Sequence, residues 1–142
     1  MTKVYIGIDT GRDTGFAAWD GEKFLEIDTK RIHAALLEVL RYCANFGKEA
    51  VTVYIEDARL RTWIPREKSL SEFKGRAQGA GSVKRDATIW EDFCKDNEIT
   101  LVKVPPKNNT TKLRAGTFAR ITGWKARTSE HARDAAMLVF QK

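Results

Sequence analysis

The chain opens with apolar and polar residues in alternation, a pattern typical of strands that bury one face. Val4, Ile6 and Ile8 occupy every second position of the first such segment. Turn-forming residues interrupt the pattern at 10–15 and again at 20–21, and both interruptions are typical of hairpins. Three strands joined by turns are therefore expected, at residues 3–9, 16–19 and 23–28.

Helical periodicity begins after the third expected strand. Aliphatic residues recur along one side of residues 30–46 and a glycine follows, so this segment predicts a helix capped by Thr29. Short apolar segments at 51–56 and 100–104 predict two buried strands. Residues 59–78 carry many charges with little periodicity, which predicts a long loop with at most a helical turn. Further helices are expected at 79–96, 111–122 and 129–140, the last of them capped by Thr128 or Ser129.

The order of these elements predicts an α/β fold. Three antiparallel hairpin strands, followed by strands that alternate with helices, make a mixed five-stranded sheet with helices on both faces. The 142 residues have the size of one domain and are 42% hydrophobic, which is enough for one core. No window approaches the ~18 apolar residues of a membrane span, and Cys43 and Cys94 fit neither a zinc site nor a disulfide framework. A soluble, cytoplasmic single domain with reduced thiols is expected.

Positive charge is concentrated in two segments of the chain. The formal net charge is +6, yet residues 58–85 alone carry +6 and residues 103–133 carry +7, while the remainder is acidic on balance. A surface that needs only solubility intersperses both signs. Lysine and arginine in acid-poor segments favour a polyanion, because they neutralise phosphates and release counterions. Nucleic acid is therefore the expected partner, with ordinary solvation of charged faces as the alternative.

Two carboxylates are expected at the ends of strands. Asp9 ends the first strand and Glu56 the fourth, each on the face opposite to the aliphatic residues of its strand. If these strands are neighbours, the carboxylates lie side by side, and a cation or a shared proton must relieve their repulsion. His131 and Asp134 are three residues apart in the last helix and project from one face of it. Oxygen ligands with one imidazole favour Mg²⁺ or Mn²⁺ over a structural zinc. Taken singly, each residue is equally consistent with a polar side chain at a solvated edge.

Several short motifs follow one another in a recognisable order: Ile6-Gly7-Ile8-Asp9-Thr10-Gly11 with Gly15 after it, Ile55-Glu56, Gly75-Arg76-Ala77-Gln78-Gly79, and His131-x-x-Asp134-Ala135-Ala136. Together they resemble the RuvC-type Holliday junction resolvases of the RNase H-like superfamily, over nearly the whole chain. The resemblance implies one RNase H-like nuclease domain over residues 1–142. It also implies phosphodiester hydrolysis that leaves 5′-phosphate and 3′-hydroxyl ends.

The resemblance also implies roles for individual residues. Asp9 would bridge two Mg²⁺ ions, for which Mn²⁺ can substitute, while Glu56 would bind one ion and Asp134 the other. His131 would bind metal or position the attacking water. The implied substrate is branched DNA, either four-way junctions or flaps, cut by a homodimer in the cytoplasm of a bacterial or phage-infected cell. Neither a membrane nor a small-molecule cofactor is implied.

An aromatic wedge is expected near the catalytic residues. In bacterial members of the family it follows the second carboxylate within a few residues, whereas here the first aromatic residue after Glu56 is Trp63. We expect Trp63 to open the junction or to stack on a base, with packing of the loop as the alternative. The expected phosphate contacts are the cations of the two basic segments: Arg59, Arg61, Arg66, Lys68, Lys74, Arg76, Lys107, Lys112 and Arg114.

Three other classes of protein share part of this pattern. The pre-ribosomal RNA processing nucleases share the fold, the length and the opening Asp-x-Gly, but their middle signatures are not evident here. Actin-like ATPases and sugar kinases need two such domains, which 142 residues cannot supply. A catalytically silent DNA-binding module would not gather carboxylates beside phosphates, because without metal they weaken binding.

Overall fold

A computed structural model describes residues 2–60, 70–106 and 112–142, with the backbone alone at 58, 70–80 and 83. The strands are β1 (Val4–Asp9), β2 (Asp13–Trp19), β3 (Phe24–Arg31), β4 (Val51–Glu56) and β5 (Thr100–Val104). The helices are α1 (Ile32–Phe46), α2 (Leu70–Asp96), α3 (Ala115–Thr122) and α4 (Glu130–Val139), with short 3-10 turns η1 (Lys48–Ala50) and η2 (Ala58–Leu60).

The five strands form one mixed sheet in the order β3-β2-β1-β4-β5. The pairs β1–β2 and β2–β3 are antiparallel, whereas β4 runs parallel to β1 and β5 parallel to β4. Parallel neighbours need a crossover connection, which α1 supplies before β4 and α2 supplies before β5. The predicted fold class, three hairpin strands followed by parallel strands, is confirmed.

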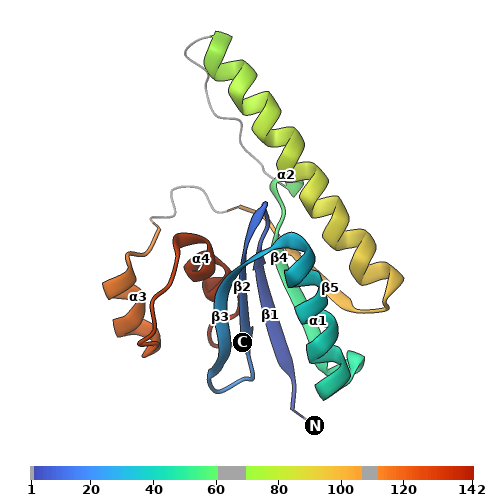
Figure 1. The fold of residues 1–142 in the computed structure, drawn as a ribbon, viewed down its shortest axis with the longest axis vertical. Helices are drawn as coiled ribbons and strands as arrows, with labels where there is room; N and C mark the ends of the chain where they lie inside the picture. The colour runs from blue at the N-terminus through green and yellow to red at the C-terminus, as the bar shows by residue number, and fades with distance from the viewer. Residues whose placement is uncertain (1, 61–69, 107–111) are drawn as a thin grey trace.

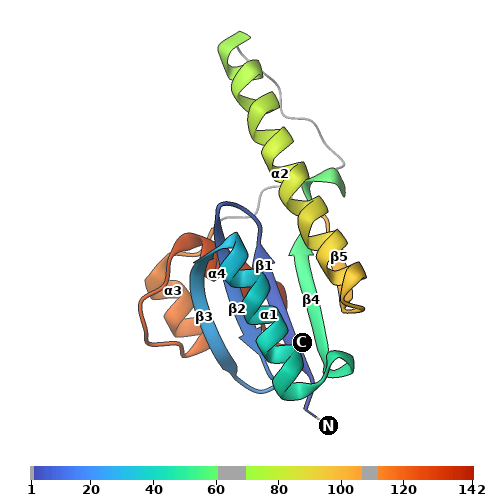
Figure 2. The ribbon, with the colours of Figure 1, turned by 45° about the vertical axis from the view of Figure 1, so that its right-hand side comes forward.

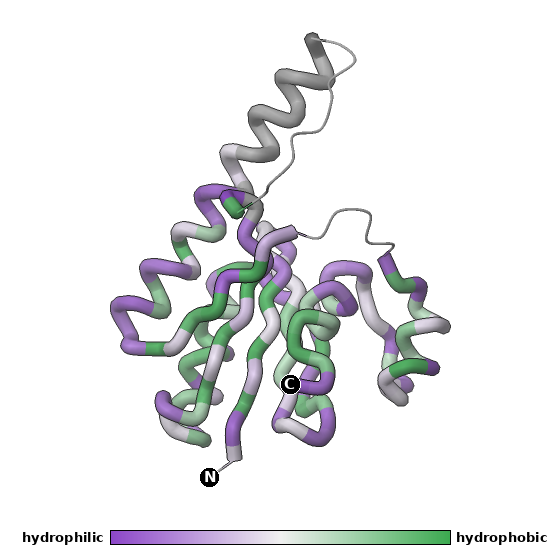
Figure 3. Tube along the Cα trace, turned by 180° about the vertical axis from the view of Figure 1, so that it is seen from behind, coloured by the Kyte–Doolittle hydropathy of each residue, from purple (hydrophilic) through white to green (hydrophobic). Residues whose placement is uncertain are grey.

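Helices cover both faces of the sheet, with α1 and α2 on one side and α4 and α3 on the other (Figures 1 and 2). On the first face Ile6 of β1 belongs to a buried cluster with Ala35 of α1 and Trp90 of α2. On the second face Ala17 of β2 is buried with Ala135 of α4. Apolar and polar residues recur in turn along the coloured helices, which is typical of helices that bury one side (Figure 3).

The predicted start of α1 is wrong. Thr29 does not cap this helix but belongs to β3, where it pairs with β2, and α1 begins only at Ile32. The strand continues because β2 itself begins at Asp13, earlier than expected, and offers pairing as far as Arg31. Backbone pairing along a whole strand outweighs the single hydrogen bond of a hydroxyl cap.

The predicted loop before α2 is wrong in its second half. The helix begins at Leu70 instead of residue 79, and it projects beyond the end of the sheet in both views (Figures 1 and 2). Residues 59–78 carry many charges and little apolar periodicity, so their pattern does not indicate where the helix begins. Gly75 and Gly79 further lower the helix propensity of this segment. In the opposite sense, α3 begins at Ala115, later than the expected residue 111.

Other expectations about the fold agree with the structure. Of the two possible caps of α4, Ser129 is the one used, since its hydroxyl accepts a hydrogen bond from the backbone N–H of Ala132 at 3.0 Å. Cys43 in α1 and Cys94 in α2 are free and buried. Among the described helices, none combines the length and apolar character needed to cross a membrane.

Candidate active site

The four candidate catalytic residues lie at one end of the sheet. Because β1 and β4 are parallel and Ile8 pairs with Ile55, the next residues, Asp9 and Glu56, end the two strands side by side. Residues alternate between the faces of a strand, so both carboxylates lie on the face that α4 covers. His131 and Asp134 come from the first half of α4, directly above this edge.

Two glycines allow α4 to lie on the strands without an intervening side chain. A Cβ on Gly7 would stand 2.0 Å from the carbonyl oxygen of Ala135, and one on Gly15 would stand 2.0 Å from that of His131. A carbon atom cannot approach an oxygen so closely, so both positions require glycine. Since Gly15 pairs with Asp9 across β1 and β2, this close packing holds His131 beside Asp9.

Asp9 and His131 form the central contact of the site. Oδ2 of Asp9 and Nδ1 of His131 share a hydrogen bond of 2.8 Å. The Asp9 side chain is mostly buried, and this burial raises its pKa; the hydrogen bond with His131 lowers it in part, while the negative charge of Asp134 raises it further. The Asp9 carboxylate is therefore unfavourable as an isolated anion, a condition that a cation would relieve.

A lysine of the chain contributes a cation to this site. Nζ of Lys112 lies 2.7 Å from Oε1 of Glu130 and 3.2 Å from Oδ2 of Asp134. The two carboxylates raise the pKa of Lys112, which in turn lowers the pKa of Glu130. From the sequence, Lys112 is expected to contact a phosphate, whereas the structure pairs it with two acidic residues of α4.

The side chains at this edge offer the types of donor atom that bind divalent ions. Asp9, Glu56 and Asp134 offer carboxylate oxygens and His131 an imidazole nitrogen, a set that Mg²⁺ and Mn²⁺ accept. As the side chains stand, no three His, Cys, Asp or Glu within the described ranges are grouped closely enough to hold an ion. Asp9 is engaged by His131 and Asp134 by Lys112. The residues thus fit a metal ion chemically once these contacts yield, and metal binding stays a prediction.

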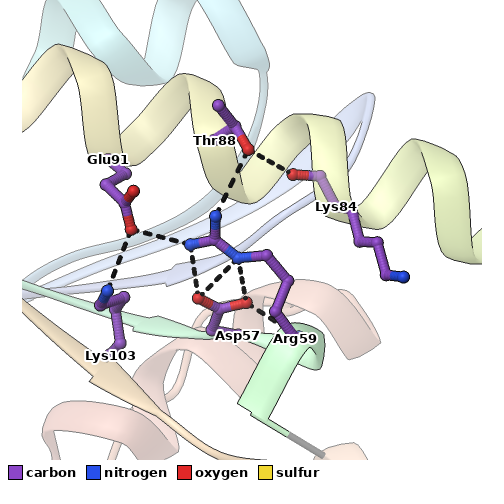
Figure 4. A network of polar contacts seen from close by, with 6 residues as sticks. All are labelled: Asp57, Arg59, Lys84, Thr88, Glu91 and Lys103. Carbon is purple, nitrogen blue, oxygen red and sulfur yellow. Dashed lines mark hydrogen bonds and ion pairs between the residues drawn. The ribbon is translucent and has the colours of Figure 1, made fainter.

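A network of ion pairs around the buried Asp57 holds the chain directly after Glu56 (Figure 4). The carboxylate of Asp57, 1% exposed, accepts hydrogen bonds of 2.7–3.0 Å from the guanidinium of Arg59, which lowers the pKa of Asp57. The same guanidinium donates to Glu91 of α2 at 2.8 Å, and Lys103 of β5 contacts Glu91 at 3.0 Å. The network therefore ties the end of β4 to α2 and β5.

This network was not foreseen from the sequence, which assigns Arg59 to phosphate binding. The available signal was the spacing of Asp57 and Arg59, two residues apart after a strand, where an aspartate side chain can close a turn. Of the remaining expected DNA contacts, Arg114 is exposed at the start of α3. Side chains outside the described part of the structure are those of Arg61, Trp63, Arg66, Lys68, Lys74, Arg76 and Lys107.

Four cations surround α3 without acidic partners. Arg114, Arg120, Lys125 and Arg127, which we call the α3 basic patch, are all exposed. None of them forms an ion pair with another described residue, and the sequence holds neither Asp nor Glu from residue 105 to 129. By contrast, Lys103 and Lys112 of the second basic segment are both paired within the chain. Among the described residues of this segment, the patch is therefore open to an external anion.

The comparisons with known proteins concern the fold. No family model matches this chain, and no curated protein matches it by sequence. Among solved structures, it is similar to T. thermophilus RuvC in complex with a Holliday junction substrate, with 17% sequence identity and a TM-score of 0.56. The match covers 95% of this chain and 89% of that one. The chain therefore has the RuvC-like form of the RNase H-like fold.

Proposed function

We propose that this protein is a metal-dependent endonuclease that resolves Holliday junctions and related branched DNA. The observation that carries the proposal is the contact of Asp9 with His131, with Asp134 beside it, in a chain of RuvC-like fold. The similar RuvC structure is a complex with a Holliday junction, which supports this class of substrate for the present chain.

The Asp9–His131 pair defines where a proton can be held. When Nδ1 of His131 carries the proton and donates it to Asp9, Nε2 keeps its lone pair and can accept a proton from water. The imidazole is half exposed, so water can reach it. His131 can therefore orient a water molecule and take up its proton at Nε2.

Asp9, Glu56 and Asp134 would hold divalent ions, with His131 as a further ligand or as the residue that positions water. When bound, such ions supply an activated water and stabilise the leaving 3′ oxygen. The chain itself fixes the donors: Gly15 sets the height of α4 above Asp9, and the Asp57 network anchors the backbone next to Glu56. Because these donor side chains are already held in position, less conformational entropy is lost when the site is assembled for the reaction.

Two elements that carry basic residues flank the catalytic edge, the part of α2 before Asp86 and α3. α2 projects past the end of β4, and α3 lies beyond α4 (Figures 1 and 2). The α3 basic patch provides guanidinium and ammonium groups with no acidic partner in the described segments, so they are available for backbone phosphates. A duplex arm that leaves the catalytic edge is expected to cross α3.

Resolution of a four-way junction needs two symmetric cuts, and a homodimer with two-fold symmetry supplies two equivalent sites. We therefore propose a dimer as the active form. We propose that this dimer acts on branched DNA in the cytoplasm of a bacterial or phage-infected cell.

A cleavage assay on a labelled four-way junction tests the proposal. Linear duplex, flap, single-stranded DNA and RNA serve as controls, each with Mg²⁺, Mn²⁺ or EDTA. Paired, metal-dependent nicks confined to the junction would support the proposed function. Cleavage of flaps or RNA alone would move the function towards debranching or RNA processing, and tight binding without cleavage would indicate a silent DNA-binding module.

A further inference from the structure

Lys112 brings a positive charge into the candidate active site from the chain itself. Its ammonium contacts Glu130 at 2.7 Å and Asp134 at 3.2 Å. Its charge also acts on Asp9, where burial raises the pKa of the carboxyl and Lys112 offsets a small part of this rise. One ammonium thus reduces the mutual repulsion of three carboxylates at the edge where a divalent ion is expected.

We infer that Lys112 is a resident counter-cation of this site, which holds the Asp134 carboxylate until a divalent ion replaces it. The inference rests on the proposed metal-dependent function. The ammonium and the ion are attracted to the same carboxylate and repel each other, so each weakens the binding of the other. Lys112 therefore weakens metal binding by the free protein.

The exposure of Lys112 suits it to exchange. Its side chain is 58% exposed, and a lysine carries a compact charge on a flexible stem that can swing into solvent. Arg59 provides the contrast within the same chain, because its planar guanidinium holds the 1% exposed Asp57 through several hydrogen bonds. Arg59 is therefore held firmly on Asp57, whereas Lys112 can move away from Asp134.

DNA offers Lys112 another partner. The residue precedes Arg114, the first member of the α3 basic patch, by two positions. A phosphate bound at the patch would attract the ammonium of Lys112 away from Asp134 and leave the carboxylate free for metal. Coupling of this kind is reciprocal, so metal must also strengthen DNA binding. The free protein then loads metal poorly and the DNA-bound protein loads it well, which confines hydrolysis to bound substrate.

The test is a Mn²⁺ titration of the 142-residue chain without DNA, with free Mn²⁺ measured by electron paramagnetic resonance. Lys112→Met keeps the aliphatic stem and removes the charge, so it should bind Mn²⁺ about tenfold more tightly than the wild type. Lys112→Arg keeps the charge and should resemble the wild type. Lys3→Met removes an exposed cation directly before β1, at the opposite end of the strand from Asp9, and it should leave Mn²⁺ affinity unchanged.

A second titration adds a short DNA duplex. DNA should raise the Mn²⁺ affinity of the wild type clearly more than that of Lys112→Met, because the variant has no ammonium to release. Equal Mn²⁺ affinity of the wild type and Lys112→Met without DNA would overturn the inference and leave the proposed function intact. Failure of both proteins to bind Mn²⁺, with or without DNA, would overturn the inference and the metal-dependent function together.

Discussion

The carbonyl oxygen of His131 lies 2.0 Å from the point where a Cβ on Gly15 would stand. The helix that carries His131 and Asp134 therefore rests on the bare backbone of β2. Gly15 is also the strand partner of Asp9. One missing methyl group thus sets the distance between the imidazole and the carboxylate at the centre of the site.

Gly15→Ala should push α4 away from the sheet. We expect a loss of about 1–3 kcal/mol in the free energy of unfolding, as for other overpacked cores, together with loss of most junction cleavage. Urea denaturation and the cleavage assay measure the two effects. Gly116→Ala is the matched control, because a Cβ at Gly116 meets no atom within 4 Å. Unchanged cleavage by Gly15→Ala would contradict the assigned packing.

Asp9→Asn and Glu56→Gln should each reduce junction cleavage to background while junction binding in EDTA is retained. Both changes keep the shape of the side chain and remove the negative charge that a divalent ion requires. Cleavage rates with Mg²⁺ and gel-shift titrations measure the two properties. Asp13→Asn alters an exposed carboxylate paired with Arg31 and should cleave normally. Normal cleavage by Asp9→Asn or Glu56→Gln would disprove the site assignment.

Asp57→Asn should destabilise the protein in a pH-dependent way. Removing one partner of a buried ion pair costs about 3 kcal/mol at neutral pH. Arg59 lowers the pKa of Asp57 below its ordinary value of 3.8, so the ionised carboxylate stabilises the fold above that pH and the effect fades as pH falls through the lowered pKa. Urea unfolding of both proteins from pH 7 downwards should show the difference narrowing in acid. A difference independent of pH would argue against the charge of Asp57 as its source.

The double variant Arg120→Gln/Arg127→Gln should weaken binding to junctions and to linear duplex alike. Each lost phosphate contact reduces the slope of log K against log salt by about 0.9. The KM for junction cleavage should rise while kcat stays unchanged, since neither residue belongs to the catalytic edge. The control Arg31→Gln/Arg41→Gln removes the same number of positive charges. Both of these arginines are paired with carboxylates, so this variant should keep the salt slope of the wild type. An unaltered salt slope would remove the α3 basic patch from the DNA interface.

Sequence patterns were sufficient wherever burial imposes a period. The aliphatic alternation in residues 4–8 and 51–55 predicts two strands, and its parity places Asp9 and Glu56 on the same face. The start of α2 could not be predicted in this way, because the sequence around Leu70 carries many charges and little apolar periodicity. The prediction that Thr29 caps α1 is wrong because it considers only local sequence. The strand partner of Thr29 is Gly15 of β2, which is distant in sequence.

The partners of individual charged residues were beyond the reach of the sequence. The basic segments predict an attraction for polyanions, but they do not say which cations are already neutralised. Arg59 pairs with Asp57 and Glu91, and Lys112 pairs with Glu130 and Asp134, the latter across 22 positions of the chain. Such pairings depend on how α2 and α4 lie on the sheet, and charge counts do not contain that information.

The two-sided character of β1 also limits how this protein can vary. Ile8 is wholly buried beneath α1 and α2, and Asp9, the next residue, faces the opposite helix. Deleting one residue inside this strand would turn the carboxylate into the aliphatic layer and place an isoleucine opposite His131. Related chains are therefore free to exchange one aliphatic residue for another in β1, whereas gains and losses of residues should be confined to the turns on either side.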